Sequence, residues 1–375
     1  MPGQPAVQAA PPDLAGDYFE QLRERYEQAA AVAGGAGTLD LEMAGLRLRL
    51  RYLGEPLREA LLAPFDHLAC RDAGDPALTI SLFDTAATGV EPPPPLWEPI
   101  AAAPGTNPVA RLRSERACVL AAAGSRALTA ALPAEGVAVF HLPDAAAVPP
   151  AERAAPIREA LQLLLAARGR LMTHAGAVGR DGRGVLLVGR GGSGKSTLAL
   201  SCTLAGMEIV ADDYVLLDPT SLAAHAMQST AKLTEDSAAR LGIPAEAIGP
   251  AGFEPTLEGP AKALVSIPNL APGRLKRRLE VAAVIAPKLS SSQPTYSGGG
   301  DELGEVEGPA VRAISAAEAL RAVAPSTIVQ AGFGGGDSLA TLADLVRRVP
   351  SYALELSPNP AANAAAVERL VAGLG

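Results

Sequence analysis

The stretch THAGAVGRDGRGVLLVGRGGSGKSTLALSCTLAGMEIVADD, residues 173–213, decides the fold class of this chain. It holds an apolar run over 184–189, a glycine-rich turn, and a run from residue 195 that favours a helix. A second apolar run then ends in Asp212 and Asp213. Strand, glycine-rich turn, helix and strand within about 30 residues form the unit of α/β nucleotide-binding folds. The stretch therefore predicts an α/β chain built around this unit.

The glycine-rich turn matches the pattern GxxxxGK[ST] in full, from Gly189 to Ser196. Glycines let the backbone curl so that several N–H groups point at phosphate oxygens, and the following helix adds the positive end of its dipole. In this pattern Lys195 reaches the β- and γ-phosphates, and the Ser196 hydroxyl binds Mg²⁺. We therefore predict an ATP and Mg²⁺ site. The predicted nucleotide-binding residues are Gly189, Arg190, Gly191, Gly192, Ser193, Gly194, Lys195, Ser196 and Thr197.

The same turn also contains the dinucleotide pattern GxGxxG at Gly189, Gly191 and Gly194, with Asp212 about 20 residues further on. A dinucleotide site has no use for a lysine and a serine directly after the third glycine. An NAD enzyme is therefore the less favoured interpretation.

We interpret residues 207–218 as one strand, in which Asp212 and Asp213 end the first apolar part. In a parallel sheet this strand would emerge beside the glycine-rich turn. One carboxylate would then hold Mg²⁺ and the other would accept the proton of an attacking hydroxyl. The alternative is that two acids simply cap a strand end at the surface.

His174 precedes a predicted strand and is a candidate to position a phosphate or the acceptor, or to tune the base. Taken alone, a histidine in an apolar stretch is more often structural. The other histidines are not part of any functional motif in the sequence and are interpreted as structural; they are His67, His141 and His225.

These residues together resemble the core of HPr kinase/phosphorylase and the wider family of HPr-kinase-like serine kinases. That core has a histidine, a phosphate loop, a helix ending at glycine, and a strand ending in Asp-Asp. The resemblance implies an HPr-kinase-like core, related to that of phosphoenolpyruvate carboxykinase. It implies that Asp213 is the catalytic base, that Asp212 is its neighbour on the metal side together with Ser196, and that His174 is the active-site histidine.

The sequence departs from HPr kinase proper at Thr197, where that enzyme typically has glutamate, and the phosphorylase signature is absent. The resemblance therefore implies a divergent member with an acceptor other than HPr. Relatives of this kind include kinases that phosphorylate lasso-peptide precursors. Lys232, Lys262 and Arg274 are candidates to neutralise charge at the phosphoryl group, with solvated surface charge as the alternative.

Three parts of the chain differ in composition. Residues 1–14 are rich in proline and alanine and are predicted to form a disordered tail. Residues 15–150 predict a smaller, mainly β, α+β domain, and its position makes it our candidate for acceptor recognition. Residues 151–375 predict the kinase domain.

Local patterns predict the elements of both domains. In the first domain they are a helix over 15–33, a strand hairpin turning at Gly45, and strands over 77–84 and 136–143. In the second they are helices over 151–169, 337–349 and 363–374, and strands over 282–288, 326–332 and 352–358. Segments 290–308 and 332–337 are predicted to be mobile, and 290–308 is a candidate lid over the site.

Composition excludes several classes. The net charge of −8 argues against a protein that binds the phosphate backbone of nucleic acids. No apolar run nears the roughly 18 residues of a membrane span, and no secretory signal is visible, so we expect a cytoplasmic protein without a membrane partner. The 3 cysteines form no CxxC pair, which fits a reducing compartment. A homo-oligomer is compatible with the sequence.

The sequence thus predicts an ATP- and Mg²⁺-dependent kinase that phosphorylates a hydroxyl, with serine of a protein or peptide as the favoured acceptor. Two alternatives stay open. One is a kinase of small molecules, and the other is a module that binds ATP without turnover and acts as a regulator.

Overall fold

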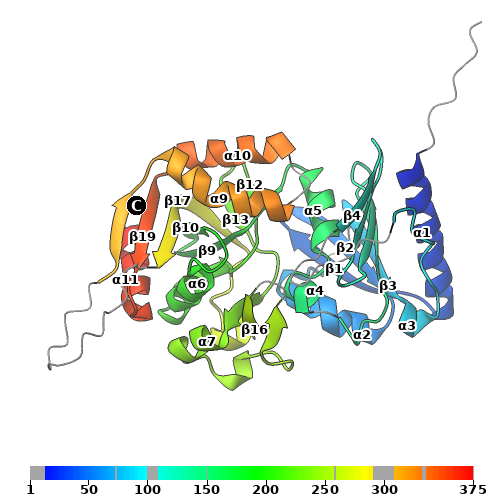
Figure 1. Cartoon of the computed structure of the whole chain (residues 1–375), viewed down its shortest axis with the longest axis horizontal. Helices are drawn as coiled ribbons and strands as arrows, with labels where there is room; N and C mark the ends of the chain where they lie inside the picture. The colour runs from blue at the N-terminus through cyan, green and yellow to red at the C-terminus, as the bar shows by residue number, and fades with distance from the viewer. Residues whose placement is uncertain are drawn as a thin grey trace, which may run out of the picture.

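The computed structural model describes residues 13–71, 74–98, 109–148, 150–256, 259–289, 308–331 and 335–374. The predicted tail over 1–14 and the predicted mobile segments over 290–308 and 332–337 lie largely outside these residues. Figure 1 shows a mixed α/β chain, so the predicted α/β class is confirmed at that level. In the described residues the strands form a seven-stranded, a nine-stranded and a three-stranded sheet.

The seven-stranded sheet belongs to the N-terminal half. Its strands, in spatial order, are β1 (Gly37–Met43), β2 (Leu46–Tyr52), β3 (Leu78–Asp84), β7 (Val137–Leu142), β6 (Leu128–Leu132), β5 (Cys118–Ala122) and β4 (Val109–Arg113). The predicted hairpin at Gly45 is confirmed: Ala44 and Gly45 have φ of 50° and 76°, which suits a tight two-residue turn. Strands β4, β5 and β6 were not predicted, because their residues show no clear strand pattern in the sequence.

Helix α1 (Leu14–Val32) covers one face of this sheet and confirms the predicted helix over 15–33. It buries Tyr18, Phe19, Leu22 and Tyr26 against sheet residues that include Phe83. The connections α2 (Glu55–Leu57), η1 (Arg58–Leu62) and η2 (Ala63–Leu68) pack on the other face, and α3 (Thr85–Thr88) follows β3.

The predicted helix over 151–169 is wrong as a single element. It is broken into α4 (Pro150–Ala154) and α5 (Arg158–Ala166). Pro156 disfavours helical backbone in the residue before it, and Ile157 has a left-handed φ of 47°. The break turns α5 onto the seven-stranded sheet, where Leu161 and Leu164 join the core.

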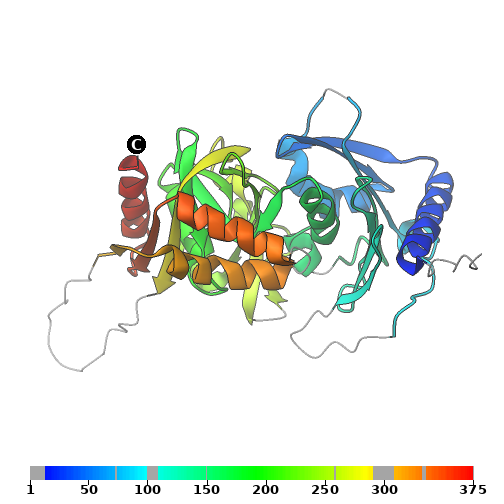
Figure 2. The same ribbon diagram turned by 90° about the horizontal axis from the view of Figure 1, so that it is seen from above.

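The nine-stranded sheet forms the C-terminal half. Its path is β11 (Glu208–Ala211), β9 (Ala175–Arg180), β10 (Arg183–Val188), β17 (Arg278–Leu289), β13 (Ala223–His225), β12 (Val215–Asp218) and β8 (Leu171–Thr173), with β19 (Ser351–Leu356) on β17 and β18 (Ala310–Ala313) on β19. Helices α6 (Lys195–Leu204) and α11 (Pro360–Ala372) bury one face, and α9 (Ala316–Ala331) and α10 (Gly335–Arg348) bury the other. Figure 2 shows α9 and α10 side by side.

Two strand predictions in this half need correction. The predicted strand over 326–332 is wrong for its described residues, because 326–331 form the end of α9. Its β-branched residues favour a strand locally. However, Ala319, Val323 and Thr327 recur every fourth residue and are all 0% exposed, so the packing of this helical face in the core outweighs the local preference for a strand. The predicted strand over 207–218 is two strands, because the chain turns at Asp212 and crosses from one edge of the sheet toward the other.

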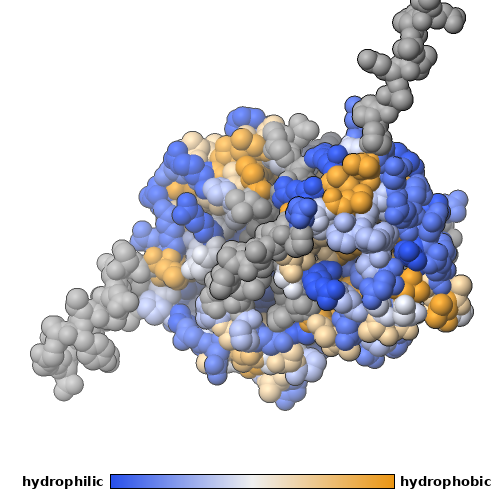
Figure 3. All heavy atoms as spheres, turned by 45° about the vertical axis from the view of Figure 1, so that its right-hand side comes forward, coloured by the Kyte–Doolittle hydropathy of each residue, from blue (hydrophilic) through white to orange (hydrophobic). Residues whose placement is uncertain are grey.

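A three-stranded sheet of β14 (Thr230–Thr234), β16 (Gly259–Ser266) and β15 (Glu254–Thr256) lies next to α7 (Glu235–Leu241), η3 (Ala245–Ala247) and α8 (Ile267–Leu270). The two halves are tied by polar contacts: Ser229 N donates to Pro64 O at 2.9 Å, and Gln228 Nε2 to Ala154 O at 2.7 Å. Among the described helices, none combines the length and apolarity needed to cross a bilayer. On the face drawn in Figure 3, the described surface is mainly hydrophilic with separate hydrophobic patches.

Candidate active site

The glycine-rich loop 189–194 joins β10 to α6, as the motif predicts. Gly189, Gly192 and Gly194 have φ of 150°, 78° and 92°, which other residues rarely adopt. Gly194 also packs so closely on Leu356 that an added Cβ would lie 2.5 Å from Leu356 Cδ1. The N-cap residue of α6 is Gly194, and no side chain of the described residues caps this end, so the first N–H groups of the helix stay available.

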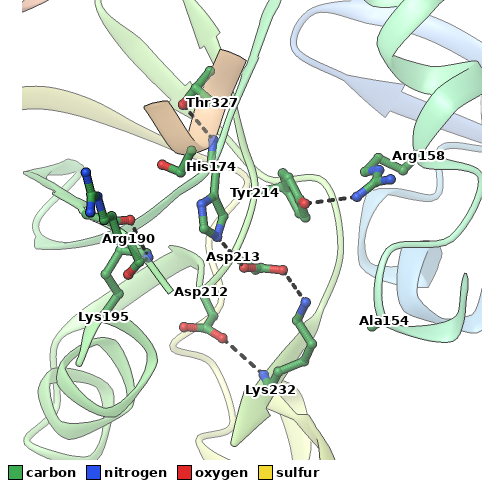
Figure 4. A network of polar contacts seen from close by, with 12 residues as sticks. Ala154, Arg158, His174, Arg190, Lys195, Asp212, Asp213, Tyr214, Lys232 and Thr327 are labelled. Atoms are coloured by element: carbon green, nitrogen blue, oxygen red, sulfur yellow. Dashed lines mark hydrogen bonds and ion pairs between the residues drawn. The ribbon is translucent and has the colours of Figure 1, made fainter. Parts of the chain in front are cut away.

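Lys195 is 6% exposed, and its Nζ donates to Gly189 O at 2.7 Å and Arg190 O at 3.1 Å. Its ammonium is therefore held inside the curl of the loop (Figure 4). Burial lowers the pKa of Lys195, and the nearby negative charges of Asp213 and Asp212 oppose this effect. The loop thus presents one buried cation next to both carboxylates.

Asp212 follows the last residue of β11 and is 1% exposed. Its Oδ2 accepts a hydrogen bond from Lys232 N at 3.1 Å, while its buried Oδ1 has no partner among the described residues. Burial and the negative charge of Asp213 raise the pKa of Asp212 to about 6, although the Lys232 N–H and the Ser196 hydroxyl lower it. An unsatisfied buried carboxylate oxygen beside a hydroxyl is a suitable site for a hard cation.

Asp213 makes two strong contacts through its carboxylate. His174 Nε2 lies 2.9 Å from Oδ1, and Lys232 Nζ lies 2.6 Å from Oδ2. Burial alone would raise the pKa of Asp213, but the Lys232 charge and the His174 hydrogen bond outweigh it and lower the pKa well below its ordinary value. Asp213 is therefore ionised at neutral pH.

His174 lies between β8 and β9 and is 6% exposed. Its backbone N donates to Thr327 Oγ1 at 3.3 Å, and its ring lies against Tyr214 with 5.5 Å between centroids. The Tyr214 hydroxyl in turn accepts from Arg158 at 3.1 Å. Figure 4 shows this chain of contacts leading from the carboxylates toward α5.

The structure therefore places together the loop, Lys195, Asp212, Asp213 and His174. The remaining predicted site residues take different positions. Ser196 lies close enough to Asp212 to lower its pKa, whereas the Thr197 hydroxyl donates to Ser237 on α7 at 3.2 Å.

The three candidate cations differ in how close they lie to the two carboxylates. Lys232 joins the cluster directly, and Lys262 shares a face of the small sheet with it and is close enough to lower the pKa of Lys195. Arg274 does not join the cluster. Its backbone carbonyl accepts a hydrogen bond from Ile209 N at 3.0 Å, near the start of β11, whereas the cluster lies at the end of that strand. Sequence reasoning missed Thr327, Tyr214 and Arg158 entirely.

No protein-family model and no curated protein sequence matches this chain. Among solved structures, the chain is similar to the Hpr(Ser) kinase/phosphatase from Coxiella burnetii, with a TM-score of 0.28 and 17% identity. The alignment covers 54% of this chain and 94% of that chain. A similarity of this size establishes neither a shared fold nor a shared activity. Membership of the HPr-kinase-like family stays a prediction.

Proposed function

We propose that this protein is an ATP- and Mg²⁺-dependent kinase, a divergent member of the HPr-kinase-like family, that phosphorylates serine of a protein or peptide. The observation that carries the proposal is the buried cluster at the end of β11. There Asp213, held by His174 and Lys232, lies beside Asp212 and the buried Lys195 of a glycine-rich loop.

The loop and α6 supply the nucleotide site. The uncapped N–H groups of α6 and the N–H groups of the loop suit phosphate oxygens. Lys195 exchanges its bonds to Gly189 O and Arg190 O for the β- and γ-phosphates when ATP enters.

Mg²⁺ fits the residues present. The partnerless Asp212 Oδ1 and the nearby Ser196 hydroxyl would hold it. No described cluster has three or more His, Cys, Asp or Glu that could hold a metal, which agrees with an ion that is bound mainly through water and substrate phosphates. When bound, Mg²⁺ neutralises charge on the β- and γ-phosphate oxygens.

Asp213 is the base of the reaction. The acceptor hydroxyl gives its proton to the Asp213 carboxylate while its oxygen forms a bond to the γ-phosphorus, and the bond from that phosphorus to the ADP oxygen breaks. His174 and Lys232 fix the orientation of this carboxylate before the substrate arrives. Because the transition state of phosphoryl transfer is loose, a weakly basic carboxylate is sufficient.

The acceptor class is tested with γ-labelled ATP, Mg²⁺ and a host lysate enriched in small polypeptides. We expect label on a discrete polypeptide with the wild type, and a loss of about 10²- to 10⁴-fold in Asp213→Asn. Asp236→Asn, an exposed carboxylate on α7 paired with Arg240, is the matched control and should keep activity. Lasso-peptide precursors are the first defined acceptors to try. ATP binding with no labelled polypeptide would favour a small-molecule kinase or a regulatory ATP-binding module instead.

A further inference from the structure

A cavity of about 530 Å³ lies in the N-terminal half, on the face of the seven-stranded sheet that α1 covers. Its walls come from α1, the segment 91–97 and strands β4 to β7, and all its lining residues precede residue 144. It is therefore separate from the cluster around Asp213. Its volume falls in the range of about 300–1,000 Å³ that is typical of ligand sites.

One wall of the cavity is rigid and apolar. Pro92, Pro93 and Pro95 form it together with Trp97 and Tyr18. The Tyr18 hydroxyl donates to Pro93 O at 2.9 Å, and the Tyr18 and Trp97 rings lie 5.4 Å apart. Proline and stacked aromatic residues lose little conformational freedom on binding, so such a wall suits an apolar side chain of an extended peptide.

The cavity also contains a buried hydrogen-bond acceptor. His141 is 3% exposed, and its Nε2 lies 2.9 Å from Thr85 Oγ1. The Thr85 hydroxyl also lies 3.2 Å from Val90 O and 3.5 Å from Glu91 Oε2. When it donates to either of them, His141 Nε2 is the protonated nitrogen. His141 Nδ1 is then a bare acceptor, and it has no partner among the described residues. Burial and Arg126 lower the pKa of His141 to about 4, which keeps the ring neutral.

A cation completes the site. Arg126 lines the cavity and has a left-handed φ of 56°, a conformation that non-glycine residues rarely adopt. No ion pair or hydrogen bond to its side chain occurs within the described part of the chain. The preceding residue, Ser125, is fixed by a 2.7 Å hydrogen bond to Glu152 of α4. The guanidinium is thus displayed on an anchored turn without a carboxylate of its own.

We propose that this cavity binds an extended segment of the polypeptide acceptor, with an apolar side chain on the Trp97 wall and a neighbouring Asp or Glu on Arg126. A peptide N–H would then satisfy His141 Nδ1. The inference rests on the proposed function in one respect, that the acceptor is a polypeptide. The cavity holds that polypeptide at a distance from the hydroxyl that is phosphorylated, because it lies on the far face of the sheet from the core shared with the catalytic half.

Trp97 is the only tryptophan of the chain, so its fluorescence reports on this cavity directly. Random dodecapeptides displayed on phage are selected on the full-length protein without nucleotide, and the enriched peptides are synthesised with blocked ends. We expect an apolar residue next to Asp or Glu in these peptides, and a shift of Trp97 emission when they bind. Arg126→Glu should weaken binding at least tenfold, while Arg25→Glu, on exposed α1 surface, should not.

Asp213→Asn should bind the peptides as the wild type does, so binding and catalysis are read separately. A wild-type protein that binds the peptides but transfers no phosphate to any polypeptide would overturn only the proposed function. Peptides that lack the acidic residue, or that bind equally to Arg126→Glu, would overturn the cavity proposal and leave the kinase assay unaffected. Equal affinity for N-acetyl-leucine would also overturn it, because the cavity would then be a small-molecule site.

Discussion

His174 Nε2 donates a 2.9 Å hydrogen bond to Asp213 Oδ1, and the two residues come from the turns after β8 and β11. Thr327 of α9 holds the backbone of His174, and Tyr214 packs on its ring. The imidazole is therefore positioned from two sides before any substrate is present. A positioned donor of this kind fixes the direction of the carboxylate lone pairs that face an incoming hydroxyl.

This geometry predicts that His174→Ala lowers kcat by about 10²-fold and leaves the KM for ATP within about twofold, because His174 contacts the base and not the loop. His174→Gln should recover part of kcat, since an amide N–H can replace the ring donor. Steady-state kinetics with a labelled acceptor measure both. His225→Ala, in β13 outside the cluster, is the control, and an equal rise in KM and fall in kcat would contradict the positioning role.

Lys232 controls the charge of the base. Its Nζ lies 2.6 Å from Asp213 Oδ2, and its charge is the main influence that lowers the pKa of Asp213 against burial. Removing that charge raises the pKa, and a base must be ionised to work. As the pH is lowered, Lys232→Gln should therefore lose activity earlier than the wild type does. The acid limb of its profile of kcat against pH should lie at a higher pH. Lys276→Gln, a half-exposed lysine paired with Glu208, should leave the limb in place.

Gly194 and Gly191 lie in the same loop, but substitution by alanine should destabilise the protein only at Gly194. At Gly194 a Cβ would meet Leu356 Cδ1 at 2.5 Å on a backbone with φ of 92°, so Gly194→Ala should lower the free energy of unfolding by about 1–3 kcal/mol and weaken ATP binding. Nothing lies within 4 Å of a Cβ at Gly191. Gly191→Ala should change stability by less than about 0.5 kcal/mol. Urea unfolding and calorimetric titration of ATP measure the pair, and equal losses would refute the packing argument.

Local chemistry explains what the sequence could predict. The loop, its flanking strand and helix, and the Ala44–Gly45 hairpin are encoded within a few residues, so their signals survive without tertiary information. The aspartates could be placed at a strand end for the same reason. His174 became a predicted site residue through the resemblance to the HPr-kinase-like family, because a lone histidine in an apolar stretch is more often structural.

Contacts over long distances could not be predicted in this way. The bond between His174 and Thr327 spans 153 positions, and Thr327 lies in a segment whose β-branched residues favour a strand until α9 is packed on the sheet. Lys232 reaches Asp213 only because a small sheet, with weak strand patterns of its own, folds over the end of β11. No periodicity in the sequence connects such elements.

Glu152 is a buried acid at the contact between the two halves. It is 6% exposed, and its Oε1 accepts a 2.7 Å hydrogen bond from Ser125 Oγ of the β5–β6 turn. Burial and the negative charge of Glu159 raise the pKa of Glu152 from 4.5 to about 7, although Ser125 and Arg158 oppose this. The folded chain therefore favours the protonated acid.

The sign of the resulting pH dependence follows from this raised pKa. The preference of the folded chain for protonated Glu152 stabilises the fold fully below about pH 4.5. This contribution is lost as the pH rises through about 7, which lowers the free energy of unfolding by up to about 3 kcal/mol. Glu152→Gln keeps the shape and cannot ionise, so its free energy of unfolding should equal that of the wild type at pH 4 and exceed it at pH 8.5. Urea unfolding at both pH values measures this, with the exposed Glu246→Gln as control. A variant that is less stable than the wild type at pH 8.5 would mean that ionised Glu152 is stabilised by Arg158 more than burial costs it.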